Sequence, residues 1–292
     1  MPRLFVHIRK ALLLALDHDM FGVAKAAAYS GMLFSFPALV VLTTLLAQVP
    51  EGSSMVGEIR GSLDQFLPEG SMDLLRSALE TNHYYSTKVL LSATSLSIFA
   101  GLGLMLSLME GFRRAYQLPR NEWSYRQRAL RAFLLVPIVL VPLWLATLLL
   151  VFGQEIEIWM INNSTHELRH IVLVSWRLVR WALALTTSVT VLSALYHFGT
   201  RRLEHWKWVI PGALGATAVW FPATLAFGWY VTRVANYSMF YGSFTAGIAT
   251  LVWLYITSLS ALLGAELNGV LFRVRQERLS PSPPPASLAS SL

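Results

Sequence analysis

Two stretches of the 292-residue sequence contain side chains whose types and spacing could do chemistry. The first, HELRH, matches the H-E-x-x-H pattern, in which His166 and His170 would share one helix face and bind zinc while Glu167 acts as a general base. The same letters have a structural explanation, because Ser164 and Glu167 form the S-x-x-E capping box that opens a helix. Since no third ligand accompanies the two histidines, we expect a helix cap here, and neither a metal nor another cofactor.

The second stretch is LLGAELNG, which places Glu266 and Asn268 in an otherwise apolar run. A carboxylate inside a membrane is costly, so it should face the interior of the helix bundle and find a partner. We predict that Glu266 pairs with Lys25, or with a donor such as the Tyr29 hydroxyl. Asn268 should lie on a different helix face, nearer the membrane surface. Glu266 would then act either as a contact that locks helices together or as a functional gate.

The composition is that of a membrane protein. Only 13% of the residues are charged, against about 25% in soluble domains, and 55% are hydrophobic. Six apolar runs are each long enough for a helix that crosses a bilayer: about 24–49, 88–109, 130–152, 178–198, 208–231 and 244–271. The sequence therefore predicts an all-α, polytopic membrane domain over residues 24–272, with no soluble catalytic domain attached.

Three other segments flank or interrupt these spans. Residues 1–23 are predicted to form a cytoplasmic amphipathic helix on the membrane surface, because leucine and isoleucine recur every four residues beside Arg9 and Lys10. The loop over about 50–87 is predicted to form amphipathic helices outside the membrane. Residues 273–292 are rich in proline and serine toward their end, so we expect a disordered cytoplasmic tail.

Prolines and basic residues predict the shape and orientation of the spans. Interior prolines fall in the odd-numbered spans, at Pro37, Pro137, Pro142 and Pro222. Because proline interrupts helix hydrogen bonding, these spans are predicted to be kinked. Of the 23 Lys and Arg residues, 16 fall on the side that carries both termini. Cytoplasmic loops hold such an excess, so both termini are predicted to be cytoplasmic.

Three stretches together resemble a known family: AKAAAYSGMLFSFPALVVL, MEGFRRAYQLPR and MFYGSFTAGIATLVWLYITSLSALLGAELN. The chain is similar to the YihY/BrkB family of bacterial inner-membrane proteins, once labelled ribonuclease BN, over about residues 18–275. The residues that carry the resemblance are Ala28, Tyr29, Ser35, Pro37, Tyr241, Gly242, Trp253, Tyr255, Gly264, Ala265 and Glu266. Ser35, Pro37, Tyr241 and Gly242 therefore join Glu266, Lys25, Tyr29 and Asn268 as candidate functional or helix-locking residues.

The resemblance implies a six-span inner-membrane protein and assigns no agreed activity. Ribonuclease activity is not expected, because RNA cleavage needs metal-binding carboxylates or paired acid and base groups, and the carboxylates on the basic side are scattered among arginines. We expect a non-enzymatic protein that transports or organises a lipid or another amphiphile in the cell envelope. A small-solute or ion-coupled transporter and a membrane scaffold are the alternatives. Proline-broken spans favour a transporter, but the scarcity of ionisable residues in the spans counts against ion coupling.

The basic loops also indicate partners. The densest cluster, GFRRAYQLPRNEWSYRQRALR, includes Arg113, Arg114, Arg126 and Arg128. Positive charge on a cytoplasmic loop is explained by membrane topology, so no nucleic-acid partner is expected, and the nearest polyanion is the anionic lipid head group. A second copy of the chain or another envelope protein is the remaining candidate partner.

Overall fold

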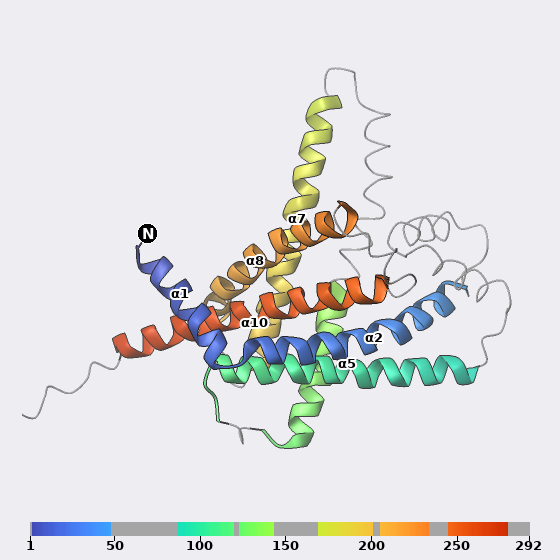
Figure 1. Ribbon diagram of the computed structural model, residues 1–292, viewed down its shortest axis with the longest axis horizontal. Helices are drawn as coiled ribbons and strands as arrows, with labels where there is room; N and C mark the ends of the chain where they lie inside the picture. The colour runs from blue at the N-terminus through green and yellow to red at the C-terminus, as the bar shows by residue number, and fades with distance from the viewer. Residues whose placement is uncertain are drawn as a thin grey trace, which may run out of the picture.

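The computed structural model describes residues 2–47, 87–119, 123–142, 169–200, 205–233 and 245–279. All regular structure in these ranges is α-helical, as the sequence predicts (Figure 1). The named helices are α1 (Pro2–Asp17), α2 (Met20–Ala47), α5 (Thr87–Ala115), α7 (Arg169–Gly199), α8 (Trp206–Arg233) and α10 (Thr245–Leu279). A further helical segment covers 125–142.

Four helices are long and apolar enough to cross a membrane: Leu90–Ala115, Val174–Gly199, Trp206–Val231 and Gly247–Arg278. They correspond to the second, fourth, fifth and sixth predicted spans. The first predicted span lies largely in α2, and the third begins in the helical segment 125–142 and continues outside the described residues. The described residues therefore contain four candidate spans, and the full set of six stays a prediction.

The prolines do not end the helices that contain them. Helix α2 continues through Pro37, and α8 continues through Pro211 and Pro222. Kinks at the odd-numbered spans stay a prediction. The prediction of a disordered tail over residues 273–292 is wrong for its first part, because α10 remains helical to Leu279. Its last turns are held by neighbouring helices: Arg273 Nη1 donates to the Ala115 carbonyl over 3.5 Å.

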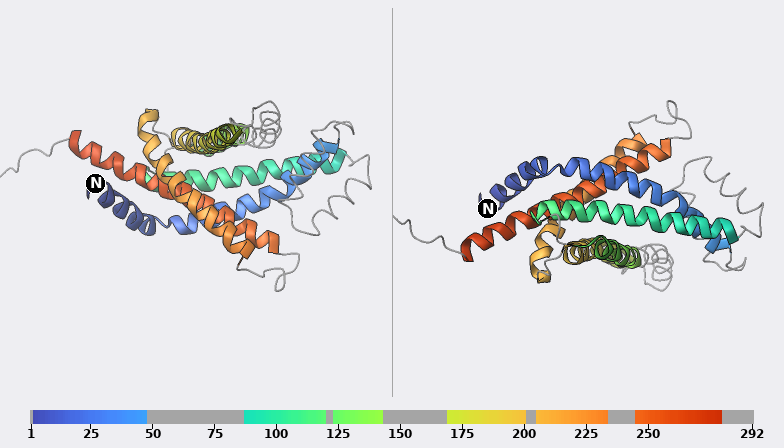
Figure 2. Two further views of the ribbon diagram at one scale, coloured as in Figure 1. Left: turned by 90° about the horizontal axis from the view of Figure 1, so that it is seen from above. Right: turned by 90° about the horizontal axis from the view of Figure 1, so that it is seen from below.

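Helix α10 is the centre of the arrangement. It contacts α1, α2, α5 and α8, so its side chains meet all of these helices (Figure 1). Figure 2 shows α7 almost end-on while α5 and α10 lie across the view, so α7 crosses these two helices steeply. Because Glu266 and Asn268 lie on α10, both are placed where several helices meet.

Large side chains are buried mainly at one end of the bundle, which we call the packed end. Its core combines α1, the start of α2, the end of α5, the segment 125–142, the end of α7, the start of α8 and the second half of α10. Central members are Met20, Phe112, Leu135, Tyr196, Val209 and Leu262. The rings of Phe112 and Tyr196 meet edge to face with centroids 5.3 Å apart, an arrangement that aromatic pairs prefer. Sixteen basic residues were assigned to this end of the spans from the sequence, so the packed end is also the one predicted to be cytoplasmic.

The other part of the bundle exposes its large apolar side chains, and we call it the apolar half. It comprises residues 29–38, 90–104, 181–189, 214–232 and 245–259. Exposed members include Leu33, Phe36, Leu91, Leu96, Phe99, Trp181, Leu225, Trp229 and Trp253. Side chains of this kind are stable against lipid tails and costly in water, so this half has the surface of a membrane-embedded structure.

Small residues bring α8 and α10 together. A Cβ added to Gly264 would collide with the Gly212 carbonyl oxygen, and would lie 2.5 Å from the Tyr196 hydroxyl and 2.6 Å from Ala216 Cβ. The Tyr196 hydroxyl donates to the Ala261 carbonyl over 2.6 Å. Small residues at such positions let two helix backbones approach closely in a membrane. This contact fixes where α10 places its two polar residues.

Candidate functional site

The turn between α1 and α2 places a histidine against α10. Helix α1 ends at Asp17, and Asp19 adopts a left-handed backbone with φ of 54°, which a short polar residue tolerates. Asp19 Oδ1 then accepts from the Gly22 N–H over 3.2 Å and caps the start of α2. A Cβ at Gly22 would lie 2.5 Å from the Asp19 carboxylate, so a larger residue here would require that side chain to move. The turn holds His18 between the two helices.

His18 is the partner of Glu266. The Glu266 side chain is completely buried, and His18 Nδ1 donates to Glu266 Oε1 over 2.5 Å. The other nitrogen, His18 Nε2, lies 3.3 Å from the amide nitrogen of Gln117, which can donate to it. One imidazole ring therefore connects α10, the α1–α2 turn and the end of α5. Glu266 Oε2 is buried without a hydrogen-bond partner.

The prediction for Glu266 is confirmed in one part and wrong in the other. Glu266 faces the bundle interior, as predicted. Its partner is neither Lys25 nor Tyr29, both of which are exposed at the surface. The physical reason is that the left-handed backbone at Asp19 turns the chain between α1 and α2 and places His18 against Glu266, whereas Lys25 and Tyr29 lie on the exposed face of α2. The imidazole fills the position that the prediction gave to the lysine.

Gln117 ends α5 in an unusual conformation. The Leu118 N–H donates to the Arg113 carbonyl and the Gln117 N–H donates to the Arg114 carbonyl, which is the Schellman pattern of a helix end. The residue at the left-handed position of this motif is normally glycine, but here it is Gln117 with φ of 53°. A strained backbone is retained where the side chain is used, and this side chain reaches His18.

Glu110 collects three of the arginines that the sequence analysis assigned to lipid head groups. Arg113 contacts both Glu110 oxygens, at 2.7 Å and 3.1 Å, while Arg114 and Arg128 donate to the same carboxylate over 3.3 Å and 3.2 Å. Arg114 also donates to the His18 carbonyl over 3.2 Å and lies 3.4 Å from Asp19 Oδ2. This network joins α5, the helical segment 125–142 and the α1–α2 turn.

The four arginines of that prediction therefore have different surroundings. Arg113, Arg114 and Arg128 are held by carboxylates, whereas Arg126 is exposed. Contact of these residues with anionic lipid stays a prediction, and the paired arginines have less charge to offer a lipid because Glu110 and Asp19 balance it.

Asn268 binds α8, on a different face of α10 from Glu266, as predicted. Its Oδ1 accepts from the Gly212 N–H over 2.7 Å, and its Nδ2 donates to the Val209 carbonyl over 3.0 Å. Pro211 lacks an N–H, so the helix hydrogen bonding around it is incomplete. Asn268 supplies hydrogen bonds to the backbone at this position and fixes the start of α8 against α10.

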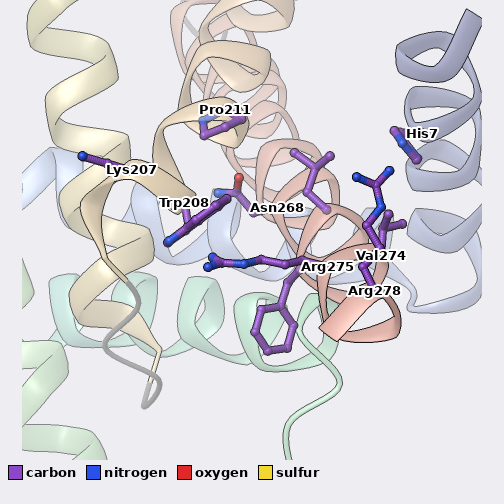
Figure 3. Close-up of a pocket in the computed structure, with 10 residues that line it drawn as sticks. His7, Lys207, Trp208, Pro211, Asn268, Val274, Arg275 and Arg278 are labelled. Carbon is purple, nitrogen blue, oxygen red and sulfur yellow. The ribbon is translucent and has the colours of Figure 1, made fainter. Parts of the chain in front are cut away.

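A cleft of about 420 Å³ opens beside Asn268 (Figure 3). It lies between His7 of α1, the first turns of α8 and the last turns of α10. The residues that line it are His7, Lys207, Trp208, Pro211, Asn268, Leu271, Phe272, Val274, Arg275 and Arg278. The Arg275 guanidinium lies 3.4 Å from the centre of the Trp208 ring, a cation–π contact between α10 and α8.

The remaining sequence candidates have separate locations. Ser35 donates to the Met32 carbonyl within α2 over 2.8 Å, and Pro37 is buried in the same helix. Tyr241 and Gly242 lie outside the described residues, as do His166 and Glu167 of HELRH. Within the ranges that the structure covers, no group of three His, Cys, Asp or Glu side chains could hold a metal ion.

Comparison with known sequences decides the family. A sequence model of the family described as "Virulence factor BrkB" matches residues 13–289. The chain belongs to the BrkB family. This confirms the resemblance found in the sequence, and it confirms a family of membrane proteins without an established activity.

Individual relatives carry similarly general names. The chain is 28% identical over 255 residues to a ribonuclease-like protein called YfkH of Bacillus subtilis, covering 86% of this chain and 90% of YfkH. It is 24% identical over 264 residues to a UPF0761 membrane protein of Vibrio campbellii, covering 89% of this chain and 80% of that one. A UPF0761 membrane protein of Chromohalobacter salexigens is 24% identical over 253 residues, but the match spans only 59% of its length. No solved structure matches the chain.

Sequence reasoning missed His18, Gln117 and the cleft. A weak signal for His18 was present, because the polar triplet Asp17-His18-Asp19 interrupts two apolar helices. Gln117 gave no signal, since its role depends on a backbone conformation that its residue type does not indicate. The cleft combines residues from three helices, so no single motif could reveal it.

Proposed function

We propose that this BrkB-family protein moves or organises a lipid or another amphiphile in the membrane without enzymatic chemistry. One observation carries the proposal: the bundle combines a packed end rich in charge with an apolar half that exposes its large side chains. Head groups are compatible with the first surface and acyl chains with the second.

The distribution of ionisable residues supports an apolar cargo. The ranges that make up the apolar half contain no Asp, Glu, Lys, Arg or His. In the described spans, Glu266 is held by His18, and Glu110 is surrounded by arginines near the end of α5. Proton and ion pumps use several ionisable groups in their membrane interior, and the described helices offer no such series.

Helix α1 adds a surface suited to the membrane interface. Ala11 and Ala15 are buried, whereas Leu12, Leu13 and Leu16 are each more than half exposed. A helix with one apolar face left open is typical of a helix that lies in the interface plane. Through the α1–α2 turn, this helix is joined to His18 and Glu266. A change in how α1 contacts lipid could thus be transmitted to α10.

The proposal is tested in cells that lack the protein. In spheroplasts, an impermeant amine reagent measures the share of aminophospholipid in the outer leaflet of the inner membrane. We expect this share to differ between the depleted strain and the same strain with the protein restored. An equal share in the two strains for every aminophospholipid would contradict a role in lipid movement between leaflets.

The two alternative functions give different results. A scaffold would form a stoichiometric crosslink to another envelope protein in native membranes, and its loss would leave the lipid distribution unchanged. A small-solute transporter is favoured by Pro222 in the middle of α8. It would move a polar solute into vesicles while leaving lipid movement at the level of protein-free vesicles.

A further inference from the structure

The cleft beside Asn268 combines positive charge with an apolar lining. Lys207, Arg275 and Arg278 bring formal charge to it, and His7 adds a titratable ring. Figure 3 shows Arg278 directed toward His7 of α1, while Arg275 lies across Trp208 of α8. Arginines of α10, a lysine of α8 and a histidine of α1 therefore line one volume of about 420 Å³, with the Lys207 amine directed away from the two arginines (Figure 3).

Among the described residues, no carboxylate lines this cleft. Within the described ranges, Lys207, Arg275 and Arg278 form no ion pair, and Glu277 lies on α10 without lining the cleft. The arginines around Glu110 differ from those of the cleft, because each of them forms an ion pair with that carboxylate. In the part of the chain that the structure describes, the charge that lines the cleft is therefore positive, and the cleft is complementary to an anion.

The rest of the lining suits an amphiphile better than a free ion. Pro211, Leu271, Phe272 and Val274 contribute apolar surface beside the basic groups. The cleft also lies where the spans Trp206–Val231 and Gly247–Arg278 have their ends. Tryptophan and basic residues at the ends of spans are typical of the level of the lipid head groups. Inorganic phosphate would use the charge and leave the apolar surface unused.

The walls of the cleft are held in place before any ligand binds. Asn268 forms two hydrogen bonds to the start of α8, and Arg275 stacks on Trp208. A preorganised site loses less conformational entropy on binding. The geometry points to a phosphate site: we propose that this cleft binds the phosphate of an anionic phospholipid head group. Binding here needs no lipid movement, so this inference and the proposed function can fail independently.

The test uses the full-length protein in a neutral detergent. Short-chain phosphatidylglycerol, short-chain phosphatidylcholine and inorganic phosphate are titrated separately, and heat of binding is measured. We expect saturable binding of phosphatidylglycerol, and weaker binding of phosphatidylcholine, whose head group has no net charge. Inorganic phosphate that bound as tightly as phosphatidylglycerol would assign the site to soluble phosphate and overturn the lipid assignment.

Variants locate the binding in the cleft. The double variant Arg275→Gln/Arg278→Gln should bind phosphatidylglycerol about thirtyfold more weakly, since each basic residue at an anionic lipid surface contributes roughly fivefold. The matched control is Arg9→Gln/Lys10→Gln, which removes the same charge from exposed positions of α1 that do not line the cleft. Equal losses in both variants, or no loss in the cleft variant, would overturn the inference.

A single variant guards against a folding defect. Lys207 is exposed, and Lys207→Gln leaves the Arg275–Trp208 contact intact. We expect Lys207→Gln to weaken binding about fivefold with an unchanged melting temperature. Unchanged binding in this variant would contradict the assignment of Lys207 to the site. If a cleft variant loses phosphatidylglycerol binding but cells that carry it have a normal lipid distribution, the result supports the binding site in the cleft. The proposed function would then be without support.

Discussion

At the scale of single residues, His18 connects three helices through one ring. Its Nδ1 binds Glu266, and its Nε2 faces Gln117. Removing the His18 donor leaves the buried Glu266 Oε1 without its hydrogen-bond partner, at a cost of about 1–3 kcal/mol or more. We expect His18→Ala to lower the melting temperature in detergent strongly. Glu266→Gln keeps the shape and removes the charge, so we expect a smaller decrease.

A double-mutant cycle tests the pairing itself. If His18 and Glu266 act on one another, the double variant His18→Ala/Glu266→Gln should be less destabilised than the sum of the two single variants. Additive losses would show that the contact contributes nothing. The sequence left two roles open for Glu266, a functional gate and a contact that locks helices together. If the Glu266→Gln variant folds normally but no longer affects lipid distribution, the gate is favoured.

Two substitutions of Gln117 distinguish the destabilising effect of its backbone strain from the stabilising effect of its side-chain contact. Gln117→Gly relieves the positive φ and removes the contact with His18, so these effects should cancel to within about 1 kcal/mol. Gln117→Ala removes the contact and keeps the strain, and we expect it to be destabilised by about 1 kcal/mol or more. Thermal unfolding of the two variants makes the comparison. Equal stability of Gln117→Gly and Gln117→Ala would show that the backbone conformation imposes no strain.

At the scale of elements, the contact between α8 and α10 depends on missing side chains. Gly264→Ala would place a Cβ against the Gly212 carbonyl and the Tyr196 hydroxyl, so the helices must separate. We expect a loss of about 1–3 kcal/mol, the usual cost of overpacking. The control is Gly228→Ala, because an added Cβ at Gly228 meets nothing within 4 Å. Thermal unfolding that gave the two variants equal stability would contradict this packing.

The elements were predictable to the extent that they depend on local pattern. Long apolar runs predicted the four helices that are long and apolar enough to cross a membrane, whereas the close approach of α8 and α10 at Gly212 and Gly264 depends on how the helices pack. The burial of Glu266 followed from the cost of a carboxylate in an apolar run. Its partner did not follow, because the position of His18 depends on the turn at Asp19 rather than on helix periodicity. The cleft depends on three helices meeting, which no local pattern specifies.

At the scale of the whole molecule, the orientation can be tested directly, because the chain contains no cysteine. Lys88 lies near the start of α5 and Arg126 in the segment after α5, and both are exposed. With both termini in the cytoplasm, Lys88→Cys should react with an impermeant maleimide in spheroplasts, and Arg126→Cys only after lysis. The reverse pattern would place the packed end outside and contradict the positive-inside assignment.

The whole-molecule account rests on the proposal that the protein moves lipid between the two leaflets of the membrane. The most direct test measures purified protein in vesicles that contain a trace of tail-labelled fluorescent phospholipid in both leaflets. An impermeant reductant then destroys the label that reaches the outer leaflet. The account predicts that protein-containing vesicles lose a larger share of fluorescence than protein-free vesicles of the same composition. If the reductant removes only the fluorescence of label that began in the outer leaflet, for anionic and neutral phospholipids alike, the result would contradict this account.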